Sequence, residues 1–166
     1  MITLNVTVKP LYGHQEGAEK GYNPHKPGRP SHTYHTYMIA NLRLILDVEV
    51  QPGTCTASKH SAPGLWELLA RLPRDCWPTF IRGDCDWGVD DVLRAAEEVE
   101  LPYLFKLWQS KNVKKLIHKA HCSSEWSYST AGGEALESVV RRVAWERARG
   151  VVVSGRGWAM VGVVGW

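Results

Sequence analysis

Apolar and polar residues alternate at the start of the chain. Every second residue from Ile2 to Val8 is apolar, and the residues between them are polar. A period of two with β-branched side chains predicts a strand with one apolar face. Two similar runs follow at residues 34–42 and 44–50, and Pro52 ends the second one. Three successive strands without an intervening helix favour an antiparallel meander.

The apolar spacing changes to that of amphipathic helices in the next part of the chain. Helices are predicted to begin near Ser61, Val89 and Ser110, each with apolar residues recurring on one face. Short apolar segments at 79–82 and 103–107 separate these helices and predict two more strands. Three antiparallel strands followed by alternating helices and strands predict an α/β fold with a mixed, ribonuclease H-like sheet.

The pattern is ambiguous toward the end of the chain. Apolar residues from Leu136 to Val143 fit the period of a helix, but most are β-branched and equally suit a strand. Glycines interrupt the apolar run over residues 154–166. We therefore expect these last residues to form an irregular tail.

Composition narrows the class of protein only moderately. The chain has 166 residues, of which 44% are hydrophobic and 22% charged, as in an ordinary globular domain. The net charge of +3 permits nucleic-acid binding without requiring it. The four cysteines form no CxxC pair, and the chain shows neither a secretory leader nor an apolar run of membrane-spanning length. We expect a cytoplasmic protein with reduced thiols and no membrane partner.

Charge is unevenly distributed between two neighbouring segments. Residues 84–100 are rich in aspartate and glutamate, whereas residues 106–119 contain five lysines. An acidic patch that holds a metal beside a basic patch that holds phosphates suits a metal-dependent nuclease. The alternative is that both segments are simply solvated helix faces.

Two stretches resemble the catalytic domain of DDE transposases from bacterial insertion sequences of the insertion-sequence-four group. They are NVTVKPLYGHQEGAEKGYNPHKPGRPSHTYH and FIRGDCDWG, and the block GYNPHKPGRPS is the most specific part. The likeness extends over roughly residues 2–153. It implies a ribonuclease H-like fold in which Asp, Asp and Glu hold two divalent cations, Mg²⁺ or Mn²⁺. It also implies that the function is to cut transposon ends and join them to target DNA.

The resemblance assigns two of the three catalytic positions. Asp84, after a predicted strand, matches the second acid and is the expected metal ligand, and Asp86 could assist it. The first acid matches Asn5, whose neutral amide is a poorer ligand than a carboxylate. No glutamate stands in a recognisable context for the third acid. We therefore expect a truncated transposase that is inactive by itself.

The same comparison divides the chain into three expected segments. Residues 1–125 correspond to a partial catalytic domain, residues 126–153 to the start of a β-rich insertion, and residues 154–166 to the irregular tail. The expected partner is DNA, with a possible homo-oligomer or association with an intact transposase. Phosphate contacts are expected from a basic loop and from the third helix, through Lys20, Lys26, Arg29, Lys111, Lys114 and Lys115. The alternatives are a non-catalytic, DNA-binding or dominant-negative remnant, and a remnant without a partner.

Overall fold

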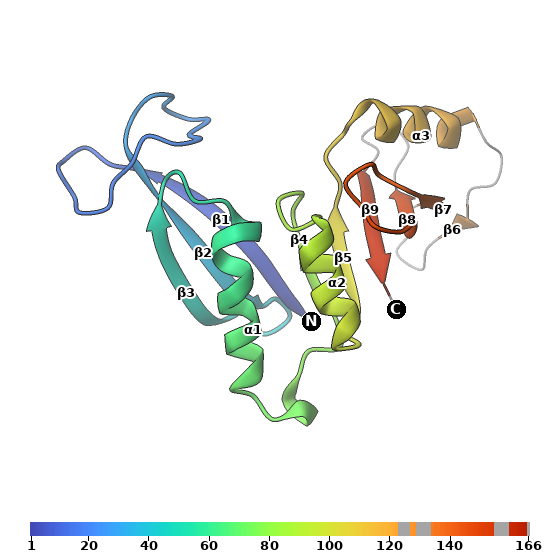
Figure 1. Ribbon diagram of the computed structural model, residues 1–166, viewed down its shortest axis with the longest axis horizontal. Helices are drawn as coiled ribbons and strands as arrows, with labels where there is room; N and C mark the ends of the chain where they lie inside the picture. The colour runs from blue at the N-terminus through green and yellow to red at the C-terminus, as the bar shows by residue number, and fades with distance from the viewer. Residues whose placement is uncertain (123–126, 129–133, 155–159, 166) are drawn as a thin grey trace. The chain divides into compact units, whose positions relative to one another are not determined.

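The computed structural model describes residues 1–122, 127–128, 134–154 and 160–165. It contains two compact units, Met1–Arg82 and Gly83–Trp166, each with its own strands and helices (Figure 1).

The first unit is built on the predicted meander. Strands β1 (Ile2–Pro10), β2 (Ser31–Ile39) and β3 (Leu44–Pro52) pair antiparallel in the order β3-β2-β1. On the free side of β1, strand β4 (Ile81–Gly83) pairs with β1 in parallel, through Ile81 and Arg82. The first strand of the chain is therefore interior in the sheet.

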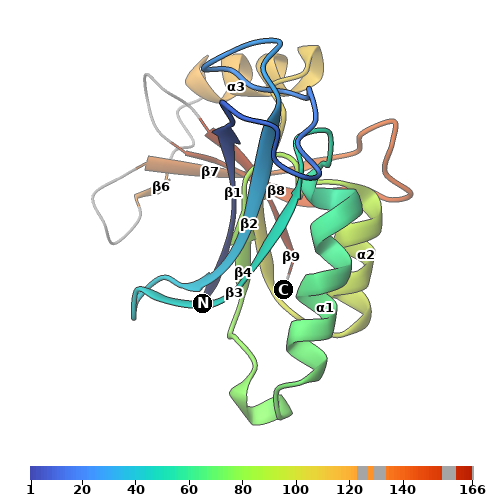
Figure 2. The same ribbon diagram turned by 90° about the vertical axis from the view of Figure 1, so that its left-hand side faces the viewer.

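One face of this sheet is covered by helix α1 (Ala62–Ala70) (Figure 2). A π-helical turn (Ala57–Ser61) precedes α1, and a 3₁₀ turn (Arg74–Cys76) follows it. The Tyr37 ring of β2 is fully buried, and its hydroxyl lies within hydrogen-bond distance of two acceptors, the Ser61 carbonyl at 2.6 Å and the Glu49 carboxylate of β3. This hydroxyl joins the start of α1 to two strands.

A neutral histidine lies in the same buried layer. His35 is 0% exposed, and its Nε2 lies 2.9 Å from the Thr33 hydroxyl. Burial, with a smaller contribution from His60, lowers the pKa of His35 to about 4. The ring is therefore uncharged at neutral pH, as expected for a histidine removed from water without a carboxylate partner.

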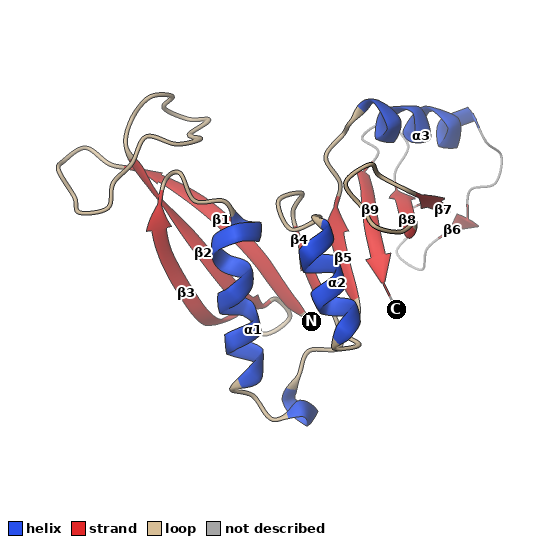
Figure 3. Ribbon diagram, viewed as in Figure 1, coloured by secondary structure: helices blue, strands red, loops and turns tan. Residues whose placement is uncertain are grey.

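The second unit combines antiparallel strands with two amphipathic helices (Figure 3). Its strands pair in the order β5-β9-β8-β7-β6. The helices are α2 (Asp90–Glu98) and α3 (Lys111–Cys122). The strands are β5 (Tyr103–Lys106), β6 (Ser127–Tyr128), β7 (Glu134–Val140), β8 (Arg149–Ser154) and β9 (Met160–Gly165).

The predicted element order up to α3 is confirmed, and the ambiguous region after it consists of strands. Residues 134–140 form β7, so the helical alternative there is wrong. The prediction of a wholly irregular tail is also wrong, because β9 occupies residues 160–165. A Cβ atom added at Gly162 would lie 2.6 Å from Leu104 of β5, and one at Gly165 would overlap Tyr103. These glycines let β9 approach β5 instead of breaking the strand.

Parts of the two expected C-terminal segments lie outside the described residues, at 123–126, 129–133, 155–159 and 166. In the part of the chain that is described, no helix is long and apolar enough to cross a membrane.

Candidate functional site

Asn5 lies in the middle of β1, on the sheet face that α1 does not cover. Its neighbour Leu4 pairs with Tyr37 on the covered face, and consecutive side chains of a strand point to opposite faces. Asn5 is exposed, and its backbone carbonyl accepts a hydrogen bond from the Thr36 hydroxyl at 3.3 Å. The amide side chain is therefore free to meet a ligand, as a site residue must be.

Asp84 stands immediately after β4, at the start of a tight loop. Its Oδ1 accepts a hydrogen bond from the backbone N–H of Asp86 at 3.0 Å, and its carbonyl accepts one from that of Trp87 at 3.4 Å. Trp87 is 1% exposed and stacks on Phe105 with ring centroids 6.5 Å apart. A Cβ atom at Gly83 would lie 2.8 Å from the Trp87 ring. The buried indole thus fixes the loop that carries the carboxylates.

The loop concentrates negative charge in a partly buried place. Burial first, and then the neighbouring Asp84, raise the pKa of Asp86, while a hydrogen bond from Trp108 acts in the opposite direction. Burial, Asp84 and Asp86 also raise the pKa of the Cys85 thiol, which keeps it protonated and unreactive. A cation close to the loop would offset the repulsion between the carboxylates of Asp84 and Asp86.

The donor set of this loop suits a hard divalent cation. Mg²⁺ in proteins is commonly held by one or two carboxylates and keeps several waters. Asp84 and Asp86 supply two carboxylates within three residues of each other. The described residues contain no group of three or more His, Cys, Asp or Glu side chains that could hold a metal. The loop therefore fits one hydrated cation, and an additional carboxylate is needed for two.

The basic loop between β1 and β2 holds its cations around one tyrosine. The Lys26 ammonium lies 5.0 Å and the Arg29 guanidinium 4.5 Å from the centroid of the exposed Tyr12 ring. The buried Asn23 accepts a hydrogen bond from the backbone N–H of Lys26 at 3.0 Å. Lys20, which comes earlier in the same loop, is also exposed. The three predicted phosphate-binding residues of this loop are accessible, and two of them are held together.

The lysines of α3 are exposed and unpaired. Val113 and Ala120 bury one side of the helix, and the Ser110 hydroxyl accepts a hydrogen bond from the Val113 N–H at its start. Lys111, Lys114 and Lys115 are exposed, and within the described residues they form no ion pair. Exposed lysines without an ion-pair partner on one helix are better explained by contacts with phosphates than by a structural role.

A buried ion network in the second unit is absent from the sequence predictions. The Arg149 side chain of β8 is only 3% exposed and binds two carboxylates of α2: Asp90 at 2.6 Å and Glu97 at 2.8 Å. Glu97 also accepts hydrogen bonds from Tyr103 at 2.7 Å and from Arg147 at 2.6 Å. Burial alone would raise the pKa of Glu97, but these three donors lower it to about 2. Sequence spacing gives no signal for these pairs, which are more than 50 residues apart for Arg149.

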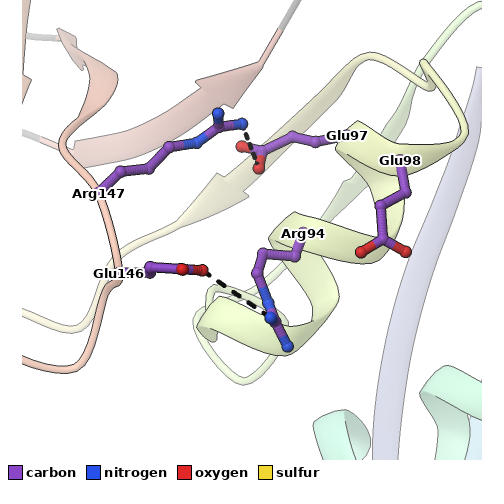
Figure 4. Close-up of a pocket in the computed structure, with 5 residues that line it drawn as sticks. All are labelled: Arg94, Glu97, Glu98, Glu146 and Arg147. Atoms are coloured by element: carbon purple, nitrogen blue, oxygen red, sulfur yellow. Dashed lines mark ion pairs between the residues drawn. The ribbon is translucent and has the colours of Figure 1, made fainter.

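The outer part of this network lines a pocket of about 440 Å³ (Figure 4). Arg147 pairs with Glu97 there, and Arg94 lies 3.8 Å from Glu146. Four of the five lining residues form two ion pairs that join α2 to the segment before β8, so we interpret the pocket as part of a brace between them.

Comparison with known proteins decides the family. A model of the family described as "Transposase DDE domain" matches residues 7–149, which is most of the chain. The chain belongs to the transposase DDE domain family. The resemblance inferred from the sequence is thereby confirmed at family level. Members of this family generally depend on divalent metals and bind DNA. No curated protein sequence matches this transposase domain.

A solved structure supports the fold of this transposase domain. It is similar to a piggyBac transposase, determined by cryo-EM as a synaptic complex with hairpin DNA, with a TM-score of 0.51 and 11% sequence identity. The match covers 98% of this chain and 32% of the piggyBac chain, so this domain spans about a third of that transposase. The predicted ribonuclease H-like fold is confirmed.

Proposed function

We propose that this transposase domain belongs to the insertion-sequence-four group and serves metal-dependent cleavage and strand transfer of transposon DNA. The observation that carries the proposal is the family match over residues 7–149, which includes the Asp84 loop. Asp84 follows β4 directly, and β4 is the parallel neighbour of β1, the strand that carries Asn5. A carboxylate at the end of one strand and a ligand in the middle of another is the arrangement that the resemblance implies.

Asp84 is the proposed metal ligand, and Asn5 stands at the position of the first acid. The cation, Mg²⁺ or Mn²⁺, would activate the attacking oxygen and neutralise charge on the leaving one. A neutral amide at position 5 removes one negative charge from the site and weakens its hold on cations. We therefore propose that the chain, acting alone, has little or no cleavage activity.

The proposed substrate is DNA, contacted through its phosphates. The exposed cations of the basic loop and of α3 supply the contacts, and such contacts make binding dependent on salt. We further propose that β7 and β8 begin the β-rich insertion of the family. Association with a second copy or with an intact transposase belongs to the same proposal.

A second candidate function is DNA binding without catalysis. The specific observation that favours it is the amide of Asn5, together with the absence of a three-ligand group among the described residues. Such a chain would occupy transposon ends, or combine with an active transposase and inhibit it.

The experiment is cleavage of supercoiled plasmid DNA with Mg²⁺ or Mn²⁺ by the native chain and by the Asn5→Asp and Asp84→Ala variants. Nicking that is absent or weak in the native chain, increases with Asn5→Asp and disappears with Asp84→Ala supports the catalytic proposal. Salt-dependent DNA binding with no cleavage by any of the three chains supports the second candidate. Cleavage that survives Asp84→Ala contradicts the assignment of Asp84.

A further inference from the structure

Helix α3 carries two metal-binding side chains on its exposed side, one helical turn apart. His118 and Cys122 are four residues apart in the helix, so they lie on the same face. The Nδ1 atom of His118 lies 3.8 Å from the Sγ atom of Cys122, and both residues are exposed. Other side chains, Val113 and Ala120, form the buried side of the helix. The imidazole and the thiol are therefore both accessible to a ligand from solvent.

The distance between the two donor atoms is close to the one that a tetrahedral metal ion imposes. Bonds of about 2.0 Å from Zn²⁺ to nitrogen and about 2.3 Å to sulfur, at the tetrahedral angle, set the two ligand atoms about 3.6 Å apart. The pair in α3 is wider by about 0.2 Å, which a small side-chain rotation closes.

The two donor atoms also match the chemistry of Zn²⁺ rather than that of Mg²⁺. A thiolate sulfur and an imidazole nitrogen are ligands that Zn²⁺ takes in proteins, whereas Mg²⁺ takes oxygen. The carboxylates of the Asp84 loop supply oxygen, so the two places on the chain differ in the metal that each selects.

The pair supplies two ligands and leaves the other coordination positions open. The described residues contain no group of three or more His, Cys, Asp or Glu side chains that could hold a metal, so within them the site has two protein ligands. Water would fill the remaining positions of a tetrahedral ion. Lys115 and Lys119 of the same helix oppose a divalent cation, whereas the thiolate that binds the metal adds one negative charge. Reversible binding follows from this balance.

We propose that His118 and Cys122 form a clamp for Zn²⁺ or a similar transition-metal ion on the surface of the second unit. The ion joins two successive turns of α3, so its binding stabilises the helix. This inference does not depend on the proposed transposase function, because its ligands are not those of the Asp84 loop.

The experiment is a titration of the full, reduced chain with Co²⁺, a spectroscopic substitute for Zn²⁺, followed by near-ultraviolet absorption. A charge-transfer band from sulfur to Co²⁺ appears only when a cysteine binds the metal, so binding of Co²⁺ by carboxylates gives no such band. The ligand variants are Cys122→Ser and His118→Gln. The matched control is Cys76→Ser, which removes the second exposed cysteine of the chain. Circular dichroism melting checks that each variant folds.

The clamp predicts a thiolate band in the native chain that saturates with one Co²⁺ per chain and disappears when Zn²⁺ is added. Cys122→Ser abolishes the band, and Cys76→Ser leaves it unchanged. His118→Gln weakens Co²⁺ binding at least about tenfold, because the loss of even a partner outside the coordination sphere costs about 10–100-fold.

A native chain without a thiolate band overturns the clamp, and so does a band that Cys76→Ser removes and Cys122→Ser retains. Equal Co²⁺ affinities of His118→Gln and the native chain also overturn it, because the thiol then binds without the imidazole. The two ligand variants test the clamp independently, so a failure of one of them to fold leaves the other as the test. None of these outcomes changes the proposals for Asp84 and for DNA binding.

Discussion

Replacing Arg149 with alanine should destabilise the second unit more than any other single arginine replacement near it. The guanidinium is buried, and three of its hydrogen bonds reach the carboxylates of Asp90 and Glu97, at 2.6, 2.8 and 3.2 Å. Removing one partner of a buried ion pair leaves uncompensated charge and costs about 3–5 kcal/mol. The two carboxylates are 18% and 19% exposed and keep weaker partners, so we expect about 3 kcal/mol, at the low end of that range.

Arg147 provides a matched control. It contacts the same carboxylate, at 2.6 Å from Glu97, but its own side chain is 64% exposed. Exposed ion pairs contribute about 0.2–1 kcal/mol, so Arg147→Ala should lower the free energy of unfolding by less than about 1 kcal/mol. Arg149→Lys should recover only part of the loss, because an ammonium cannot span both carboxylates in the way a guanidinium does.

The assay is urea unfolding followed by tryptophan fluorescence, since Trp145 is buried 5.5 Å from the Arg149 guanidinium carbon and reports on the network. Comparable midpoints for Arg149→Ala and Arg147→Ala would refute the reasoning, because burial would then not determine the cost. A full recovery by Arg149→Lys would refute the bidentate part of it.

Three further predictions follow from named contacts. The pKa of His35 is about 4 in the fold and 6.5 when unperturbed. Keeping this ring neutral should therefore favour the folded state above pH 6.5, and the free energy of unfolding should fall by about 2 kcal/mol between pH 7 and pH 5. In urea titrations, His35→Leu should flatten that decline. Gly83→Ala should lower the free energy of unfolding by about 1–3 kcal/mol in the same assay, because the added methyl group meets the Trp87 ring. An unchanged midpoint would show that the loop can shift to accommodate the methyl group. Replacing both Lys114 and Lys115 with glutamine should reduce the slope of log affinity against log salt for duplex DNA by about 1.8; an unchanged slope would place the duplex elsewhere.

The first half of the fold is predictable because local patterns decide it. The alternation from Ile2 to Val8 and the spacing of the helices identify each element up to α3, and the family resemblance supplies the ribonuclease H-like architecture. The strand at residues 134–140 and β9 are less predictable, because they depend on tertiary pairing. Gly162 and Gly165 break a strand in isolation but permit one where β5 comes close.

The candidate site divides in the same way. Asp84 and the lysines of α3 are predicted from the sequence, because a motif and a charge run mark them. Trp108 and Arg149 carry no sequence signal: a tryptophan is usually expected in the core, and an arginine on the surface. The exposure of Trp108 and the burial of Arg149 become visible only in the packed chain.

The most direct test of the central claim, that Asp84 belongs to a divalent-metal site of transposase type, is a Mn²⁺ titration followed by electron paramagnetic resonance. The chains to compare are the native one, Asn5→Asp, and Asn5→Asp combined with Asp84→Ala. We predict weak Mn²⁺ binding by the native chain, tighter binding by Asn5→Asp because a carboxylate replaces an amide, and loss of that gain when Asp84 is removed. Identical Mn²⁺ binding by all three chains would contradict the claim.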